Sequence, residues 1–173
     1  MPRKPVALAS RVAPEQPPVP AGAGASALSI WSRRTYREGV YETFEHTADI
    51  GLRVRAKDLP KLFGEAATGL FSLITEDPPP PVGDGRHSFS ISGSDVTLLF
   101  FDWLAELLYV FATAHVGFFD FDVRFSSHGL DADATSYPIN PARVDRELKA
   151  ITYHRLAVEQ REDGWVAEFI VDV

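Results

Sequence analysis

Two aspartates far apart in the chain, together with its last residue, form a set of oxygen donors that suits a divalent cation. Asp49 stands at the start of a strand-like run, and Asp172 is followed only by Val173, whose terminal carboxylate is a third donor. Carboxylate oxygens are hard ligands, which favour calcium, magnesium or manganese over zinc or copper. We therefore predict a metal site at Asp49, Asp172 and Val173, provided that the last strand folds back beside the first.

Each aspartate also has an ordinary structural interpretation. Asp is frequent in turns, where its side chain accepts a hydrogen bond from a nearby main-chain amide. Residues at a chain end such as Asp172 are often frayed in water. Against fraying, the strand-like pattern of residues 164–172 continues to the last residues. The residues alone leave both interpretations open.

Two histidines and a lysine accompany these donors. His46 and His154 would shift the preference towards manganese if either ring reached the ion. Lys149 could pair with Asp49, pair with Asp172, or contact a phosphate-bearing site on a partner. The structural alternative is that it is simply a solvated charge at the end of a strand. We treat His46 and Lys149 as accessory or partner-contact residues.

The elements that must position these residues follow from hydrophobic periodicity. Alternation of apolar and polar residues, which is typical of half-buried strands, recurs six times. Segments 59–74 and 94–113 instead have apolar residues at helical spacing. Asp58 is a candidate cap for the first helix, and the second is apolar around most of its circumference, which predicts a central buried helix. The strand-like segments are 50–56, 88–92, 119–125, 129–137, 148–160 and 164–172, with a hairpin turn at 161–164.

The order of these elements, strand, helix, strand, helix and then four strands, predicts an α+β fold. Consecutive strands joined by short turns pair antiparallel. We therefore expect an antiparallel or mixed sheet of about six strands with both helices packed on one face. The sequence contains no Gly-rich phosphate loop and no nucleophile elbow.

Composition and charge limit the functions further. With 45% apolar residues the chain can bury a core, and no apolar run approaches the roughly 20 residues that cross a bilayer. The absence of cysteine excludes disulfides and thiolate metal sites and fits a cytoplasmic protein. Residues 1–35 carry five basic side chains and one acidic one, a balance of +4, so the total of −7 leaves −11 on the rest. Such an acidic domain suits a cation or a basic protein partner better than RNA.

The first 40 residues differ in composition from the rest. Six of the 13 prolines fall within the first 35 residues, among many Ala, Gly and Ser, and this composition buries too little apolar surface to offset chain entropy. We predict a disordered Pro/Ala-rich extension over 1–40 and a single domain over 41–173. An organellar presequence is the alternative, disfavoured because proline breaks the amphipathic helix that such signals need.

Four short strings in the predicted domain resemble the archease family. They are His-Thr-Ala-Asp-Ile-Gly at 46–51, Trp-Leu-Ala-Glu-Leu at 103–107, Lys-Ala-Ile-Thr-Tyr-His at 149–154, and the end, Asp172 with a hydrophobic residue. The resemblance covers about residues 41–173. Ala105 replaces the asparagine of many relatives, and the Pro-rich arm has no counterpart in the usual family pattern.

The resemblance implies an accessory protein rather than an enzyme. Archeases are partners of the RtcB-type RNA ligase of tRNA splicing and RNA repair; they speed the transfer of GMP from GTP to the ligase's own histidine and allow multiple turnover. The implied metal ligands are Asp49, Asp172 and Val173, and the implied family lysine is Lys149. We therefore expect a cytoplasmic activator that binds Ca²⁺, Mg²⁺ or Mn²⁺, contacts RNA only through the ligase, and binds no membrane.

Two other functions stay open from the residues. A metal-dependent phosphoester hydrolase would hold its ion with Asp49 and Asp172 and use His46 or His154 as base. The larger acidic cluster of two-metal nucleases is not apparent in the sequence. A general chaperone or adaptor would need no ion at all.

Overall fold

The computed structural model describes residues 34–36, 39–46, 49–77, 79–80 and 82–173, with the main chain alone for 34–36, 39–40 and 45–46. The described strands and helices belong to one compact unit. Most of the extension predicted to be disordered, 1–40, lies outside the described residues. The first strand and the start of the second fall within it, so the sheet begins before residue 41.

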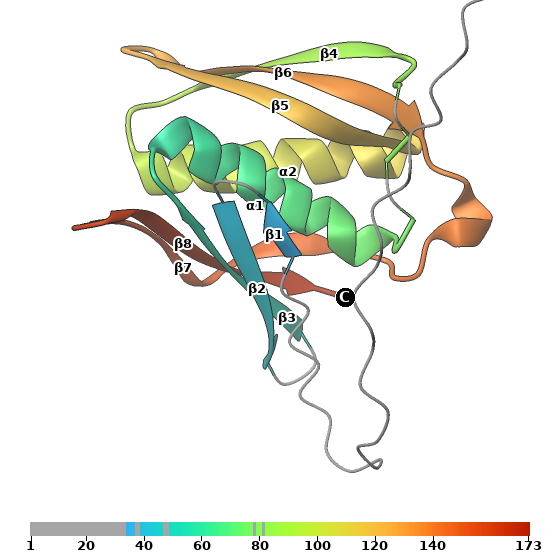
Figure 1. The fold of residues 1–173 in the computed structure, drawn as a ribbon, viewed down its shortest axis with the longest axis horizontal. Coiled ribbons are helices and arrows are strands. Elements are labelled where there is room, and N and C mark those ends of the chain that lie inside the picture. Colours follow the sequence, from blue (N-terminus) through green and yellow to red (C-terminus); the bar gives the residue numbers. More distant parts are fainter. Residues whose placement is uncertain (1–33, 37–38, 47–48, 78, 81) are drawn as a thin grey trace, which may run out of the picture. The chain divides into compact units, whose positions relative to one another are not determined.

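The described part contains eight strands, two α-helices and one short 3₁₀ helix (Figure 1). In chain order these are β1 (Arg34–Tyr36), β2 (Gly39–His46), β3 (Asp49–Ala56), α1 (Leu59–Ile74), β4 (Gly85–Ser92), α2 (Val96–Ala114), β5 (Val116–Ser126), β6 (Gly129–Pro138), η1 (Pro141–Arg143), β7 (Ala150–Arg161) and β8 (Gly164–Asp172).

The strands form two sheets, and the helices lie between them (Figure 1). The five-stranded sheet has the order β1-β2-β3-β8-β7 and the three-stranded sheet β4-β6-β5, with every pairing antiparallel. The predicted α+β class and antiparallel pairing are confirmed. The structure differs in dividing the strands between two sheets, so the helices are covered on both sides. The apolar circumference of α2 explains this, because one sheet can cover only one side of a helix.

Both helices begin at aspartate caps. Asp58 Oδ1 accepts a hydrogen bond from the main-chain nitrogen of Lys61 at 2.9 Å, which confirms the predicted cap of α1. Asp95 caps α2 by accepting from the main-chain nitrogens of Thr97 and Leu98, each at 2.9 Å. The second helix therefore begins slightly later than the sequence indicated.

The second helix corrects one expectation from the sequence. By length and composition alone α2 is long and apolar enough to cross a membrane, although no apolar run was expected to approach that length. Its apolar side chains, however, pack between the two sheets: Trp103, Leu104 and Leu107 are fully buried. The indole nitrogen of Trp103 donates to the main-chain oxygen of Phe63 at 3.0 Å, which joins the two helices. This packing is that of the core helix of a globular domain, as the prediction of a central buried helix stated.

Candidate metal site

The two predicted aspartates lie at the same end of adjacent strands. β3 and β8 are neighbouring strands in the five-stranded sheet, and their register pairs Ile50 with Val171. Asp49, the first residue of β3, therefore lies next to Asp172, the last residue of β8. Side chains alternate along a strand, and Ile50 and Val171 pack towards the helices. Both carboxylates thus lie on the sheet face that points away from the helices.

Lys149 joins the start of β7 to the end of β8. Its main-chain nitrogen donates to the main-chain oxygen of Asp172 at 2.9 Å. Its Nζ donates to the main-chain oxygen of Val173 at 2.7 Å and lies 3.9 Å from Asp172 Oδ1. This is the pairing with Asp172 that the sequence allowed for Lys149. The end of the chain is thus ordered against β7, and a positive charge already lies beside two of the three proposed ligands.

The environment of Asp172 is half open to water. Its side chain is 45% exposed, and that of Lys149 is 57% exposed. The helices cover the face of β8 that carries Ala167, Phe169 and Val171, and Asp172 lies on the opposite face. Burial therefore does not require a counter-ion here, and the case for a cation rests on the donor chemistry.

The described side chains alone do not complete a metal site. Among them, no three His, Cys, Asp or Glu gather in a way that could hold an ion. The proposed set has two carboxylate side chains, so it depends on a main-chain oxygen of Val173 as its third donor. Only the main chain of His46 is described; it pairs with Asp49 in the β2–β3 register. Residues 47 and 48, which complete the first string, lie outside the described residues.

The Thr-Tyr-His string forms a large bulge in β7. Pairing with β8 stops at Thr152, opposite Ile170, and resumes at Ala157, opposite Glu168. Between these two pairs the chain advances by five residues along β7 but by only two along β8. Within the bulge Arg155 has a left-handed backbone, with φ of 56°, a conformation that a non-glycine residue adopts only when its surroundings impose it.

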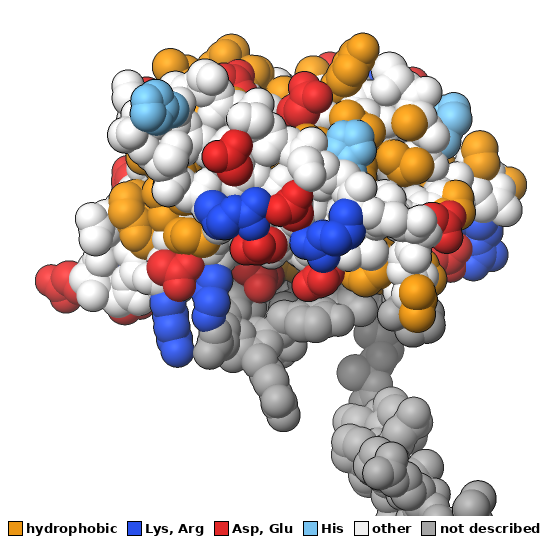
Figure 2. Space-filling model, turned by 90° about the horizontal axis from the view of Figure 1, so that it is seen from above, with side chains coloured by type: hydrophobic (Ala, Val, Ile, Leu, Met, Phe, Trp, Pro, Cys, Tyr) orange, Lys and Arg blue, Asp and Glu red, His pale blue; other side chains and the backbone are white. Residues whose placement is uncertain are grey.

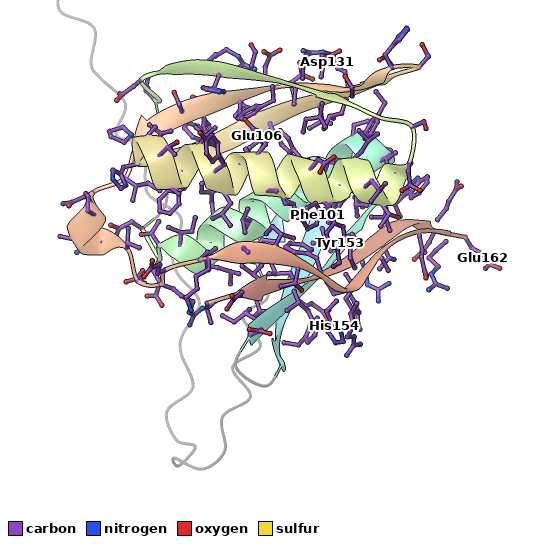
Figure 3. All side chains as sticks on the ribbon, turned by 180° about the vertical axis from the view of Figure 1, so that it is seen from behind. Phe101, Glu106, Asp131, Tyr153, His154 and Glu162 are labelled. Carbon is purple, nitrogen blue, oxygen red and sulfur yellow. The ribbon has the colours of Figure 1, made fainter. Side chains whose placement is uncertain are left out.

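The bulge directs neighbouring side chains to different parts of the molecule. The Tyr153 ring stacks on Phe101 of α2, with centroids 4.0 Å apart and planes 13° from parallel, and stays 63% exposed. Figure 3 shows this pair between α2 and β7, whereas His154 lies on the side of β7 away from α2. The buried hydroxyl of Thr152 has no hydrogen-bond partner within the described part of the chain. The two ends of the third string thus have different contacts: Tyr153 packs on the helix layer, whereas Lys149 lies against Asp172 and Val173.

An arginine cluster that we did not predict lies on the same sheet face as the two aspartates. We use this name for Arg53, Arg155 and the carboxylate between them, Glu168. Arg53 donates to Glu168 Oε2 from Nε at 3.1 Å and from Nη2 at 2.7 Å, and Arg155 Nη2 lies 2.8 Å from Oε1. Both guanidinium carbons also lie 5.8 Å from the centre of the Phe44 ring. The outward alternation of Arg53 and Glu168 was readable in the sequence; the place of Arg155 was not, because it depends on the bulge.

Comparison with known proteins identifies the family. The chain matches the Archease protein family over residues 41–173. It is similar to "Protein archease" of Methanosarcina barkeri, with 31% identity over 140 residues that cover 77% of this chain and 95% of the relative. The protein of the same name from Saccharolobus islandicus is 35% identical over 137 residues, covering 77% and 98%.

A solved structure agrees with this assignment. The solution structure of Methanobacterium thermoautotrophicum protein 1598 superposes with a TM-score of 0.63 at 27% identity, and the match covers 77% of this chain and 98% of that one. The strings at 46–51, 103–107 and 149–154 all lie within the matched range. The chain therefore belongs to the archease protein family.

Proposed function

We propose that this protein is a divalent-metal-binding accessory protein that promotes guanylylation and multiple turnover of an RtcB-type RNA ligase, in tRNA splicing and RNA repair. Family membership supports an accessory role of the archease class. The observation that carries the metal part is the convergence of Asp49, Asp172 and Val173 at one strand end, with Lys149 against the last two. The protein is an activator in this proposal, and the ligase performs the chemistry.

The donor set fits a hard divalent cation. Asp49 and Asp172 would hold Ca²⁺, Mg²⁺ or Mn²⁺ together with a main-chain oxygen of Val173. Such an ion, when bound, supplies positive charge that orients phosphate oxygens. The contribution of the protein itself is to fix the two carboxylates on adjacent strands and to hold the end of the chain through the main-chain nitrogen of Lys149, so that the donors are placed before the ligase is met.

Charge supports a protein partner rather than direct contact with RNA. Outside the first 35 residues the chain carries −11, the difference between the total of −7 and the +4 of that segment. An acidic domain is repelled by phosphates and is steered towards a basic surface such as an RNA-binding cleft. We therefore place RNA contact on the ligase, and the protein in the cytoplasm with it.

A guanylylation assay with limiting ligase tests the accessory role. Ligase–GMP formation from labelled GTP and product turnover are measured with and without the protein. The wild-type protein should raise both, and Asp49→Asn and Asp172→Asn should return them to the level of ligase alone. Asp163→Asn, the same change in the turn at the opposite end of β8, is the matched control and should activate like wild type. No rise with the wild-type protein ends the proposal.

Calorimetric titration with Mn²⁺ and Ca²⁺ tests the metal part separately. Binding heat should appear with the wild type and with Asp163→Asn, and should disappear with Asp172→Asn. Activation without any binding heat would favour a metal-free adaptor. Steady hydrolysis of a phosphoester by the protein alone with Mn²⁺ would instead favour the hydrolase alternative.

A further inference from the structure

The free edge of β4 lacks the features by which strand edges are usually protected. The described sheets have four edges, formed by β1, β7, β4 and β5. Short length, bulges, lysine and proline are the common protections of an edge. β1 has three residues, and register shifts interrupt β5 and β7. β4 instead pairs with β6 without interruption from Gly85 to Ser92, and its single Lys, Arg or Pro residue is Arg86.

Within the described residues, the unpaired side of β4 faces a groove rather than a covering element. The groove has a volume of about 620 Å³ and is lined by β4 from His87 to Ser92 and by residues of α2, among them Ala105 and Tyr109. Figure 3 shows α2 running beside β4, with Glu106 on the side of the helix that faces the three-stranded sheet. A paired strand lies about 4.8 Å from its neighbour. The groove therefore lies where an added strand would run.

Carboxylates line the helix side of this position. On α2, Asp102 and Glu106 line the groove, are exposed, and form no ion pair within the described residues. On the outer face of the sheet the charges are mixed: Asp131 is exposed and pairs in register with Ser90 of β4, but Arg86 of β4 lies on the same face. Figure 2 looks down on this face and shows acidic side chains near its centre, interspersed with basic ones. Side chains that an added strand turns towards α2 would thus meet negative charge.

The helix also offers apolar contact beside the groove. Tyr109 is 63% exposed and lines the groove, and Leu98 on the same helix is 51% exposed. An added strand places alternate side chains on opposite faces. A segment that alternates cationic and apolar residues would therefore match the groove, with main-chain hydrogen bonds giving affinity and side chains giving selectivity.

We propose that the free edge of β4 is a strand-addition site for an extended segment of a partner protein that bears Lys or Arg. A second copy of this chain is a poorer occupant, because pairing two β4 edges would bring Asp102, Glu106 and Asp131 of both copies to one seam. The site lies in the three-stranded sheet, whereas Asp49 and Asp172 belong to the five-stranded one. The proposal therefore stands independently of the metal site and of the ligase.

Hydrogen exchange of the full chain tests strand addition directly. The probes are two synthetic eight-residue peptides, one alternating Lys with Val and one alternating Glu with Val. The Lys peptide should slow exchange of edge-facing amides in residues 85–92 by a factor of 1 + [peptide]/Kd, about tenfold at ten times Kd. The Glu peptide should leave them unchanged. Equal protection by both peptides, or by neither, overturns the proposal.

Charge-changing variants test the selectivity. Ser90→Lys and Glu106→Lys each place a positive charge beside the added strand and should raise Kd for the Lys peptide about threefold to tenfold at low salt. Glu162→Lys, in the distant β7–β8 turn (Figure 3), is the matched control and should not change Kd. If all three variants weaken binding equally, the peptide responds to net charge and the proposed site is wrong.

Two results without any peptide would also overturn the proposal. Protection of the edge-facing amides in residues 85–92 that rises with protein concentration would assign the edge to a second copy of the chain. Protection that is present at every protein concentration would assign it to another segment of the same chain. The proposal requires that these amides exchange fast in the protein alone.

Discussion

Replacing Glu168 by glutamine should destabilise the domain measurably, because this single carboxylate serves both guanidinium groups of the arginine cluster. Glu168→Gln keeps the shape of the side chain but removes its charge. Arg53 and Arg155 would then face one another across a neutral amide, beside the Phe44 ring that both contact. Arg155 would also lose the ion pair that offsets its left-handed backbone.

The expected cost lies between the values for buried and for exposed ion pairs. The Glu168 side chain is 14% exposed, whereas those of Arg53 and Arg155 are 40% and 50% exposed. Breaking a fully buried pair costs about 3–5 kcal/mol, and an exposed pair contributes about 0.2–1 kcal/mol. Because water reaches both guanidinium groups, we expect a loss of about 2 kcal/mol. With a urea slope of about 2 kcal/mol/M for a domain of this size, the midpoint should fall by about 1 M at constant slope.

Glu159→Gln is the matched control. Glu159 also pairs with an arginine, Arg161, but both side chains are more than half exposed, at 52% and 59%. This control should lower the urea midpoint by no more than about 0.3 M. Equal shifts for the two variants would refute the reasoning, since they would show that the burial of Glu168 adds nothing to the strength of its ion pairs.

Three further perturbations follow from single contacts. Hydrogen bonding by Arg143 lowers the pKa of Asp77. The pair therefore stabilises the fold above the unfolded-state pKa of about 3.9, and this effect is lost as pH falls through the lower folded-state pKa. In urea unfolding, the difference in stability between wild type and Asp77→Asn should accordingly disappear on acidification. Lys149→Met removes an ammonium that lies against the proposed ligands, so calorimetry should show about tenfold tighter Mn²⁺ binding, and an unchanged Kd would place the ion elsewhere. Gly51→Ala puts a Cβ 2.1 Å from the Phe44 ring, and thermal unfolding should show a loss of about 1–3 kcal/mol.

Local sequence signals predicted the elements that place the candidate site. The alternation in 50–56 and 164–172 and the cap at Asp58 are local features, and each is found in the structure. The proximity of Asp49 and Asp172 was a hypothesis that required the last strand to fold back beside the first, and the β3–β8 pairing meets that condition. What sequence reasoning could not supply is the register that pairs Ile50 with Val171. The metal itself stays a prediction.

Features that depend on distant contacts were not predictable in the same way. The division into two sheets requires β4 to pair with β6, past α2 and β5. Strand β1 follows a proline-rich segment whose composition favoured disorder, and among the described strands it pairs with β2 alone. The position of Lys149 was open among three partners, since only the fold shows that the start of β7 meets Asp172.

The β7 bulge did leave a signal in the sequence, in the phase of its alternation. Ile151 packs towards the core, and so do Leu156 and Val158, which means that the apolar positions change from odd to even numbers within one strand. A regular strand cannot bury both sets on one face, so an odd number of extra residues must lie between Ile151 and Leu156. The Thr-Tyr-His string occupies that interval. Substitutions in the string will therefore report on the geometry of the bulge, and only a variant that keeps its stability while losing binding heat would connect them to the ion.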